Sequence, residues 1–403
     1  MKKFNKVISA FMTSAMVTAM LAGCTDPAST ATTNSQEPAQ ATESSSDNGA
    51  TFKIGAIGPL TGGAAVYGNA VCNAAELAVE EINAAGGING YQVEYSKEDD
   101  ELNAEKSVNA YNTLKDWGMQ ILVGSTTSAC SIAVSENTKA DNMFQLTPSG
   151  SAEECVKYDN VFRVCFSDPN QGIASAQYIA DHNLATKVGI IYDSSDVYSS
   201  GICQKFTEEA KDKNFEIVSS EAFTADNATD FSVQLQKAKD AGADLVFLPI
   251  YYQAASLILT QANTMDYKPV FFGVDGMDGI LSVENFDTKL AEGVMLLTPF
   301  AADAKDDLTV NFVKNYQEKY GEVPNQFAAD AYDAVYIIKQ ALEAKSVTPD
   351  MSTSDICEAL KGAMTEIEAS GLTSAKMTWE ASGEPNKEPK AVVIKEGAYV
   401  SAE

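Results

Sequence analysis

Histidine and arginine are almost absent from this sequence. Its 403 residues include one histidine, His182, and one arginine, Arg163. Every mechanism that needs a histidine general base or a histidine-ligated metal therefore has to use His182. This residue lies near the end of a predicted helix, before Asn183, and we expect it to be exposed there.

Positive charge as a whole is scarce. Lysine and arginine together number 28 against 56 aspartates and glutamates, which gives a net charge of -28 at pH 7. Such an acidic surface repels phosphate backbones, and no basic run interrupts it. These numbers exclude nucleic acid as a partner.

Motifs of common enzymes and cofactor sites are missing as well. The sequence contains neither G-x-S-x-G nor H-E-x-x-H, and the glycine-rich stretch 58–63 matches neither the dinucleotide fingerprint nor the P-loop. The cysteine spacings fit no metal knuckle. We therefore predict a protein that is not an enzyme and that carries no cofactor and no metal. The alternative, a secreted hydrolase, needs a nucleophile and a base that the chain does not display.

A long hydrophobic run occurs only at the N-terminus, over residues 7–22. Lysines precede it, and it is shorter than the roughly 20 apolar residues that span a bilayer. It ends in Leu-Ala-Gly-Cys, which resembles the lipobox of bacterial lipoproteins. We predict that residues 1–23 are a lipoprotein signal peptide and that Cys24 carries lipid on the outer face of the bacterial cytoplasmic membrane. The alternative is an ordinary signal peptide followed by a chance cysteine.

Residues 24–50 contain no large apolar side chain after Cys24 and are rich in Ser, Thr, Ala and Gln. They predict a flexible tether. Six further cysteines follow in the body of the chain. Outside the cytoplasm an even number permits disulfides, with Cys130 and Cys155 the first pair to consider. Buried free thiols are the alternative that we prefer for most of the six.

Strand and helix patterns alternate through the body of the chain. Short apolar strands and amphipathic helices follow each other over residues 52–146, and a second run of the same kind covers residues 171–272. A further strand at 294–298 precedes three helical segments, and a hairpin pattern at 376–379 and 391–394 closes the chain. Alternation of this kind predicts an α/β fold with two lobes, each a doubly wound parallel sheet covered by helices.

Hydroxyl groups gather where two predicted strands of the first lobe end. One strand leads into residues 124–130, which include Ser128, and the next leads into 147–151. Carboxyl ends of adjacent parallel strands converge, and hydroxyls at a helix N-terminus can hold a carboxylate. Alternatively, Ser128 only caps the helix.

In the second lobe, polar and aromatic residues follow the strands. Tyr198 follows one strand and the pair Tyr251-Tyr252 follows another. Asp275 follows a third strand, within the sequence Gly-Val-Asp-Gly. A carboxylate at a strand end can meet an ammonium ion, and tyrosines there can cover a ligand. A turn-forming aspartate and half-buried packing tyrosines are the alternatives.

The motifs, taken in order, resemble one family, the Leu/Ile/Val-binding branch of periplasmic binding proteins of type 1 that serve ABC importers. The resemblance covers residues 52–400 and rests on IGAIGPLTGGAAVYGNA, EEINAAGGINGYQVEY, ILVGSTTS, TPSGS, VFRVCFSDPNQG, YDSSDVYSSG, FTADNATDFS, FFGVDG and FAADAYDAVY. It implies two lobes joined by three hinge crossovers. The implied lobes are residues 51–167 with 301–374 and residues 168–300 with 375–403, with crossovers near 166–168, 298–300 and 372–376.

The resemblance also implies roles for single residues. Ser128 and Ser151, with the backbone of Ser149, are placed to grip the α-carboxylate of an amino acid. Asp275 is placed to pair with the α-ammonium, and Tyr198 meets the same polar end. The sequence departs from the family here, because position 151 is Ser where Thr is usual and Asp275 is shorter than the commoner Glu.

Two aromatic positions complete the implied site. Tyr67 corresponds to a wall of the side-chain pocket, and a further ligand tyrosine matches Tyr252, with Tyr251 left open by the register. Near the first crossover we expect Arg163 to be a bidentate structural partner of a carboxylate.

The implied function is that of a lipid-anchored solute-binding protein. It delivers a branched-chain or similar amino acid to the permease subunits of an ABC importer. The alternative is a ligand-sensing protein for an amide, a urea or an aromatic acid.

Overall fold

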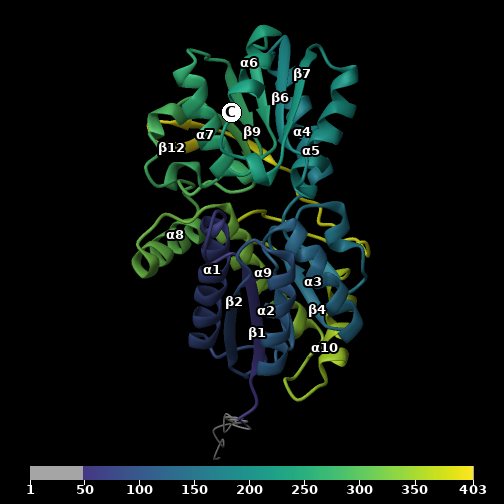
Figure 1. Cartoon of the computed structure of the whole chain (residues 1–403). Coiled ribbons are helices and arrows are strands. Elements are labelled where there is room, and N and C mark those ends of the chain that lie inside the picture. Colours follow the sequence, from purple (N-terminus) through teal and green to yellow (C-terminus); the bar gives the residue numbers. More distant parts are fainter. Residues whose placement is uncertain (1–48, 403) are drawn as a thin grey trace, which may run out of the picture. The chain divides into compact units, whose positions relative to one another are not determined.

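Two β-sheets, each covered by helices, make up residues 49–402, which are the part of the chain that the computed structural model describes (Figure 1). The predicted signal peptide, Cys24 and nearly all of the predicted tether lie outside the described residues. Within the described part, no helix is both long and apolar enough to cross a membrane.

The first sheet has five parallel strands in the order β2-β1-β3-β4-β5. We call the part of the chain built around it lobe 1. Its inner strands are buried except at Lys53, which is half-buried, as expected for a parallel sheet with helices on both faces. The strands are β1 (Phe52–Gly58), β2 (Val93–Asp99), β3 (Ile121–Val123), β4 (Phe144–Thr147) and β5 (Val161–Arg163). Its helices are α1 (Ala65–Ala84), α2 (Ala104–Trp117), α3 (Ser128–Asp141), α8 (Asp307–Tyr320), α9 (Gln326–Ala344) and α10 (Thr353–Met364).

The second sheet has seven strands in the order β12-β11-β10-β9-β8-β6-β7, and we call its surroundings lobe 2. The strands are β6 (Lys187–Asp193), β7 (Glu216–Phe223), β8 (Leu245–Leu248), β9 (Val270–Gly273), β10 (Met295–Thr298), β11 (Lys390–Lys395) and β12 (Ala398–Ser401). The helices are α4 (Asp168–Asp181), α5 (Val197–Glu209), α6 (Ser232–Asp240) and α7 (Tyr252–Thr264). Short 3-10 turns lie at Glu153–Val156, Ala210–Asp212, Ala225–Asn227, Asp275–Met277, Ile280–Ser282 and Thr288–Ala291.

The predicted α/β fold with two sheet-centred lobes is confirmed, with two corrections. The second sheet is not wholly parallel, because β11 runs antiparallel to both β10 and β12. The predicted strand 376–379 is wrong, since only the isolated bridges of Met377 and Trp379 form there. The indole of Trp379 donates a hydrogen bond to the carbonyl of Arg163 at 2.7 Å, so this segment is tied to the end of β5 instead of extending a sheet.

Arg163 is fully buried in this region and its Nη2 pairs with Oε1 of Glu384 at 2.8 Å. Its guanidinium also donates to the carbonyls of Gly150 and Ala152. The predicted carboxylate partner is therefore confirmed, but the ion pair uses one nitrogen and is not bidentate. His182 is exposed at the end of α4, as predicted.

All six cysteines of the described part are buried free thiols, which confirms the preferred prediction. Cys130 and Cys155 are not joined. Burial raises the pKa of the Cys155 thiol to about 12, so the thiolate is scarce at neutral pH.

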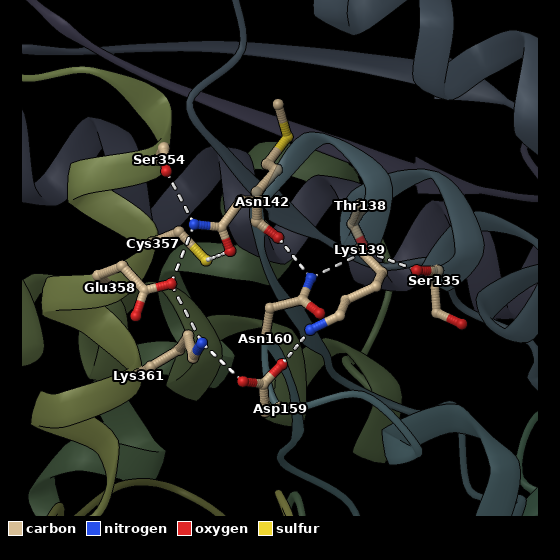
Figure 2. A network of polar contacts seen from close by, with 11 residues as sticks. Ser135, Thr138, Lys139, Asn142, Asp159, Asn160, Ser354, Cys357, Glu358 and Lys361 are labelled. Atoms are coloured by element: carbon tan, nitrogen blue, oxygen red, sulfur yellow. Dashed lines mark hydrogen bonds and ion pairs between the residues drawn. The ribbon is translucent and has the colours of Figure 1, made fainter.

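A polar network joins α10 to α3 and to the segment before β5, at the amino ends of β4 and β5 (Figure 2). Asp159 lies between Lys139 and Lys361 at 2.6 and 2.7 Å, and both lysines lower the pKa of its carboxyl, to about 2. The Asn142 amide donates to Ser354 and Glu358 of α10. Because these groups lie at the opposite ends of the strands from the polar strand ends noted in the sequence, we assign them a structural role.

A buried ion pair lies where several connecting segments meet. Lys387 and Asp330 of α9 contact each other with side-chain exposures of 1% and 3%. The ammonium of Lys387 also donates to the carbonyl of Val164 at 3.1 Å and to the hydroxyl of Thr373 at 2.6 Å. One cation therefore joins α9 to the segments that follow β5 and α10.

The substitution Lys387→Met leaves the Asp330 carboxylate buried without its cation. We expect a loss of about 3–5 kcal/mol in the free energy of unfolding, measured by urea titration. The double variant Lys387→Met/Asp330→Leu removes both charges and should regain most of that loss. Equal instability of the single and double variants would contradict this account of the pair.

Candidate ligand-binding site

The polar residues that follow strands of both sheets enclose one small cavity. It is lined by Tyr67, Thr126, Thr127, Ser128, Ser149, Tyr198, Tyr251, Asp275, Gly276 and Phe327. Its volume is about 10 Å³, which is roughly the room that one water molecule needs. Parallel strands place their carboxyl ends at one edge of a sheet, and this explains why segments after β3, β4, β8 and β9 meet here.

Hydroxyl groups form the lobe 1 side of the cavity. Oγ of Ser128 accepts hydrogen bonds from the N–H groups of Ser151 and Ala152, both at 3.2 Å. Ser149 donates to the carbonyl of Thr126 at 2.6 Å. Thr127, not Ser128, occupies the N-cap position of α3, so the alternative that Ser128 only caps the helix is wrong.

A buried carboxylate forms the lobe 2 side. Asp275 is 3% exposed, and its Oδ1 accepts a hydrogen bond from the hydroxyl of Tyr198 at 2.6 Å. Its N–H donates to Oε1 of Gln171 at 3.1 Å. Burial raises the pKa of Asp275 to about 6, although the Tyr198 hydrogen bond opposes this. Within residues 49–402 no lysine, arginine or histidine forms an ion pair with it.

A second carboxylate is buried next to the hydroxyl side. Asp168 is 2% exposed, its N–H donates to the carbonyl of Ser151 at 2.9 Å, and its two oxygens have no hydrogen-bond partner within 3.5 Å. Burial raises the pKa of Asp168 well above its usual value. Its burial therefore favours the neutral, protonated form of this carboxyl.

Aromatic rings close the remaining side. The ring centre of Tyr67 lies 4.5 Å from that of Phe327 and 5.5 Å from that of Tyr251. Tyr251 in turn stacks on Tyr198 at 4.9 Å. The hydroxyl of Tyr67 hydrogen-bonds to the carbonyl of Gly276 and so joins α1 to the segment after β9.

The structure brings five of the seven predicted site residues to the cavity wall, namely Tyr67, Ser128, Ser149, Tyr198 and Asp275. Ser151 does not line the cavity, because it lies behind Ser128 with its own Oγ buried and without a partner. Tyr252 does not line it either. Tyr252 begins α7 and packs its ring into the core, while Tyr251, one residue earlier, faces the cavity.

Thr126, Thr127, Gly276 and Phe327 line the cavity and were not predicted. The two threonines belong to the hydroxyl-rich segment that the sequence pointed to, and Gly276 follows Asp275. Phe327 comes from the start of α9, far along the chain, and no local pattern distinguishes it from a core residue. No group of three or more His, Cys, Asp or Glu within residues 49–402 could hold a metal ion.

Residues 51–395 match the model of a family described as periplasmic binding protein. The chain belongs to this family. A relative named leucine-, isoleucine-, valine-, threonine- and alanine-binding protein, from Pseudomonas aeruginosa, is 27% identical over 295 residues, which cover 73% of this chain and 78% of the relative. The family resemblance and the two-lobe fold expected from the motifs are thereby confirmed.

Solved structures have the same fold. The branched-chain amino acid transporter substrate-binding protein LivJ from Streptococcus pneumoniae, in complex with isoleucine, superposes with a TM-score of 0.80. It is 28% identical, and the match covers 88% of this chain and 99% of LivJ. A solute-binding protein of an ABC transporter from R. palustris, in complex with benzoate, matches with a TM-score of 0.76 at 18% identity over 87% and 95% of the two chains. At that identity the likeness concerns the fold alone.

The raised pKa of Asp275 predicts how stability depends on pH. The folded-state pKa of about 6 lies above the value of about 3.9 in an unfolded chain. The ionised carboxylate therefore destabilises the fold increasingly as pH rises from about 4 through 6. Asp275→Asn should increase the free energy of unfolding by about 1–3 kcal/mol at pH 7.5 and change it little at pH 4.

Urea titrations of the protein without added ligand at the two pH values test this expectation. Asp244→Asn is the matched control. Burial acts to raise the pKa of Asp244, but hydrogen bonds from Thr186 and Lys187 lower it below its usual value, so this variant should be destabilised at pH 7.5. If Asp275→Asn instead lowered the free energy of unfolding at pH 7.5, the ionised carboxylate would not destabilise the fold, and this expectation would be wrong.

Proposed function

We propose that the chain is the extracytoplasmic solute-binding lipoprotein of an ABC importer that captures an amino acid of the branched-chain type or similar. The single observation that carries this proposal is the pairing of opposite chemistries across one cavity. Hydroxyls and a helix N-terminus stand on the lobe 1 side, and a buried carboxylate without a cation stands on the lobe 2 side. A zwitterionic amino acid complements both.

The hydroxyl side suits the α-carboxylate. The first N–H groups of α3 have no partner within the helix, and its positive dipole end favours an anion. The hydroxyls of Ser128, the first residue of α3, and of Thr127 add donors, whereas the hydroxyl of Ser149 already donates to the carbonyl of Thr126. Oγ1 of Thr127 is buried without a hydrogen-bond partner and is therefore free to donate to a ligand.

The acidic side suits the α-ammonium. A buried carboxylate is costly unless a cation compensates it, and within the described residues Asp275 has no such partner. An amino acid brings that charge, whereas an aromatic acid such as benzoate brings only another anion. The observation therefore favours the amino acid over the aromatic-acid alternative. Because Asp275 is one methylene shorter than Glu, a bridging water is compatible with the same arrangement.

The aromatic side suits an apolar side chain. Tyr67 and Phe327 offer ring faces next to the polar groups. An amino acid needs more room than about 10 Å³, so its entry requires the contact between Tyr67 and Gly276 to part. A ligand that contacts both lobes stabilises the closed arrangement of the lobes. A permease can then recognise this closed form.

The remaining elements of the proposal concern placement. We propose that Cys24 carries the lipid anchor on the outer face of the membrane and that the permease subunits are the macromolecular partner. We also propose that the lobes comprise residues 51–167 with 301–374 and residues 168–300 with 375–403, and that they move about the segments 166–168, 298–300 and 372–376.

Thermal melting with each common amino acid and with benzoate tests the proposal. A ligand at 100 times its Kd adds about 2.7 kcal/mol to stability, so leucine, isoleucine or valine should raise the melting temperature while benzoate should not. Ser128→Ala should weaken the response and Asp275→Asn should abolish it. A response to benzoate that survives Asp275→Asn, with none to amino acids, would contradict the proposed ligand class.

A further inference from the structure

A second and larger cavity lies beside α1. Its volume is about 650 Å³, which is within the range of small-molecule sites. It shares no lining residue with the cavity at Asp275. The helices α1 and α8 and the strands β10 and β12 contribute to its walls. The other wall residues come from the segment after β9, the connection after β10 and the loop before α9. Figure 1 shows α8 beside α1 in lobe 1.

Most of this wall is hydrocarbon. Val66, Leu281, Leu296, Phe300 and Val313 all line it. Val323 also lines it and is 58% exposed, so apolar surface reaches the protein exterior. Covering this apolar surface with an apolar molecule removes it from water, which is favourable.

The charged groups of the wall are all acidic. Asp278, Asp303 and Glu322 line the cavity, and no lysine, arginine or histidine does. Within residues 49–402 none of the three carboxylates has an ion-pair partner, although 19 ion pairs form elsewhere. Asp303 and Glu322 are exposed, whereas Asp278 is 5% exposed.

Asp278 has capacity for a further donor. Its Oδ2 accepts the N–H of Gln326 at 3.0 Å, while its Oδ1 is buried and has no hydrogen-bond partner. A buried carboxylate with an unused oxygen is stabilised by a cationic donor. The cavity therefore combines apolar walls, acidic groups at its exposed side, and a buried carboxylate.

We propose that this cavity is a second ligand site and that it binds an amine whose ammonium pairs with Asp278 while its apolar body lies against Val66, Leu281 and Phe300. The site shares no lining residue with the amino acid site and does not rest on the proposed function. Anions of the same shape are excluded because all three charged wall groups are acidic. Neutral molecules of the same shape bind more weakly because they leave Asp278 without a cation.

The test uses the full chain and three probes of one shape, hexylamine, hexan-1-ol and hexanoate, titrated separately and followed by isothermal titration calorimetry and by NMR of the protein. Hexylamine should bind saturably and at least tenfold more tightly than hexan-1-ol, and hexanoate should not bind. Asp278→Asn should bring the affinities for the amine and the alcohol within threefold of each other. Retained binding of hexan-1-ol in this variant shows that the cavity is still formed.

A filling variant locates the probes. Ala302 lines the cavity, and Ala302→Trp should abolish binding of both the amine and the alcohol. Three results overturn the proposal. They are equal affinity for amine and alcohol in the unmodified protein, amine binding that survives Ala302→Trp, and no saturable binding of hexylamine.

Discussion

The burial of Asp275 without a cation of its own is the constraint on which the proposed binding site depends. The carboxylate follows β9 directly, and Tyr198 and Gln171 hold its position by hydrogen bonds from α5 and α4. Its ionised form is costly in this environment, which is why its pKa is raised. In the proposed function, the ammonium group of a ligand offsets this cost.

The segment that carries Asp275 also connects the lobes. Gln326 at the start of α9 donates through its side chain to the carbonyl of Asp275 and through its N–H to Asp278, both at 3.0 Å. Tyr67 of α1 hydrogen-bonds to Gly276 in the same segment. Any change in the distance between α9 and β9 must therefore alter the surroundings of the acidic group, and the proposed function uses this link between lobe position and ligand binding. Further along α9, Asp330 forms the buried ion pair with Lys387. This pair lies where α9 meets the segments that follow β5 and α10.

Much of this could be predicted from the sequence because local patterns carry it. Apolar strands alternating with amphipathic helices indicated both sheets, and hydroxyl-rich or acidic residues directly after strands indicated Ser128, Ser149 and Asp275. Where the chain offered two registers, as at Tyr251 and Tyr252, only the start of α7 decided which ring faces the cavity. Phe327 and Asp168 depend on contacts between distant segments, which no local pattern encodes. The segment 376–379 alternates like a strand, yet the hydrogen bond from Trp379 to Arg163 holds it elsewhere.

The most direct test of the central role of Asp275 is calorimetry with three matched ligands, namely the amino acid that gives the largest shift in melting temperature, its deaminated acid and its decarboxylated amine. If Asp275 pairs with the ammonium and α3 with the carboxylate, the amino acid should bind at least 100-fold more tightly than either analogue. The deaminated acid should also be insensitive to Asp275→Asn. A deaminated acid that binds as tightly as the amino acid would contradict the account, because the buried carboxylate would then have no role in recognition.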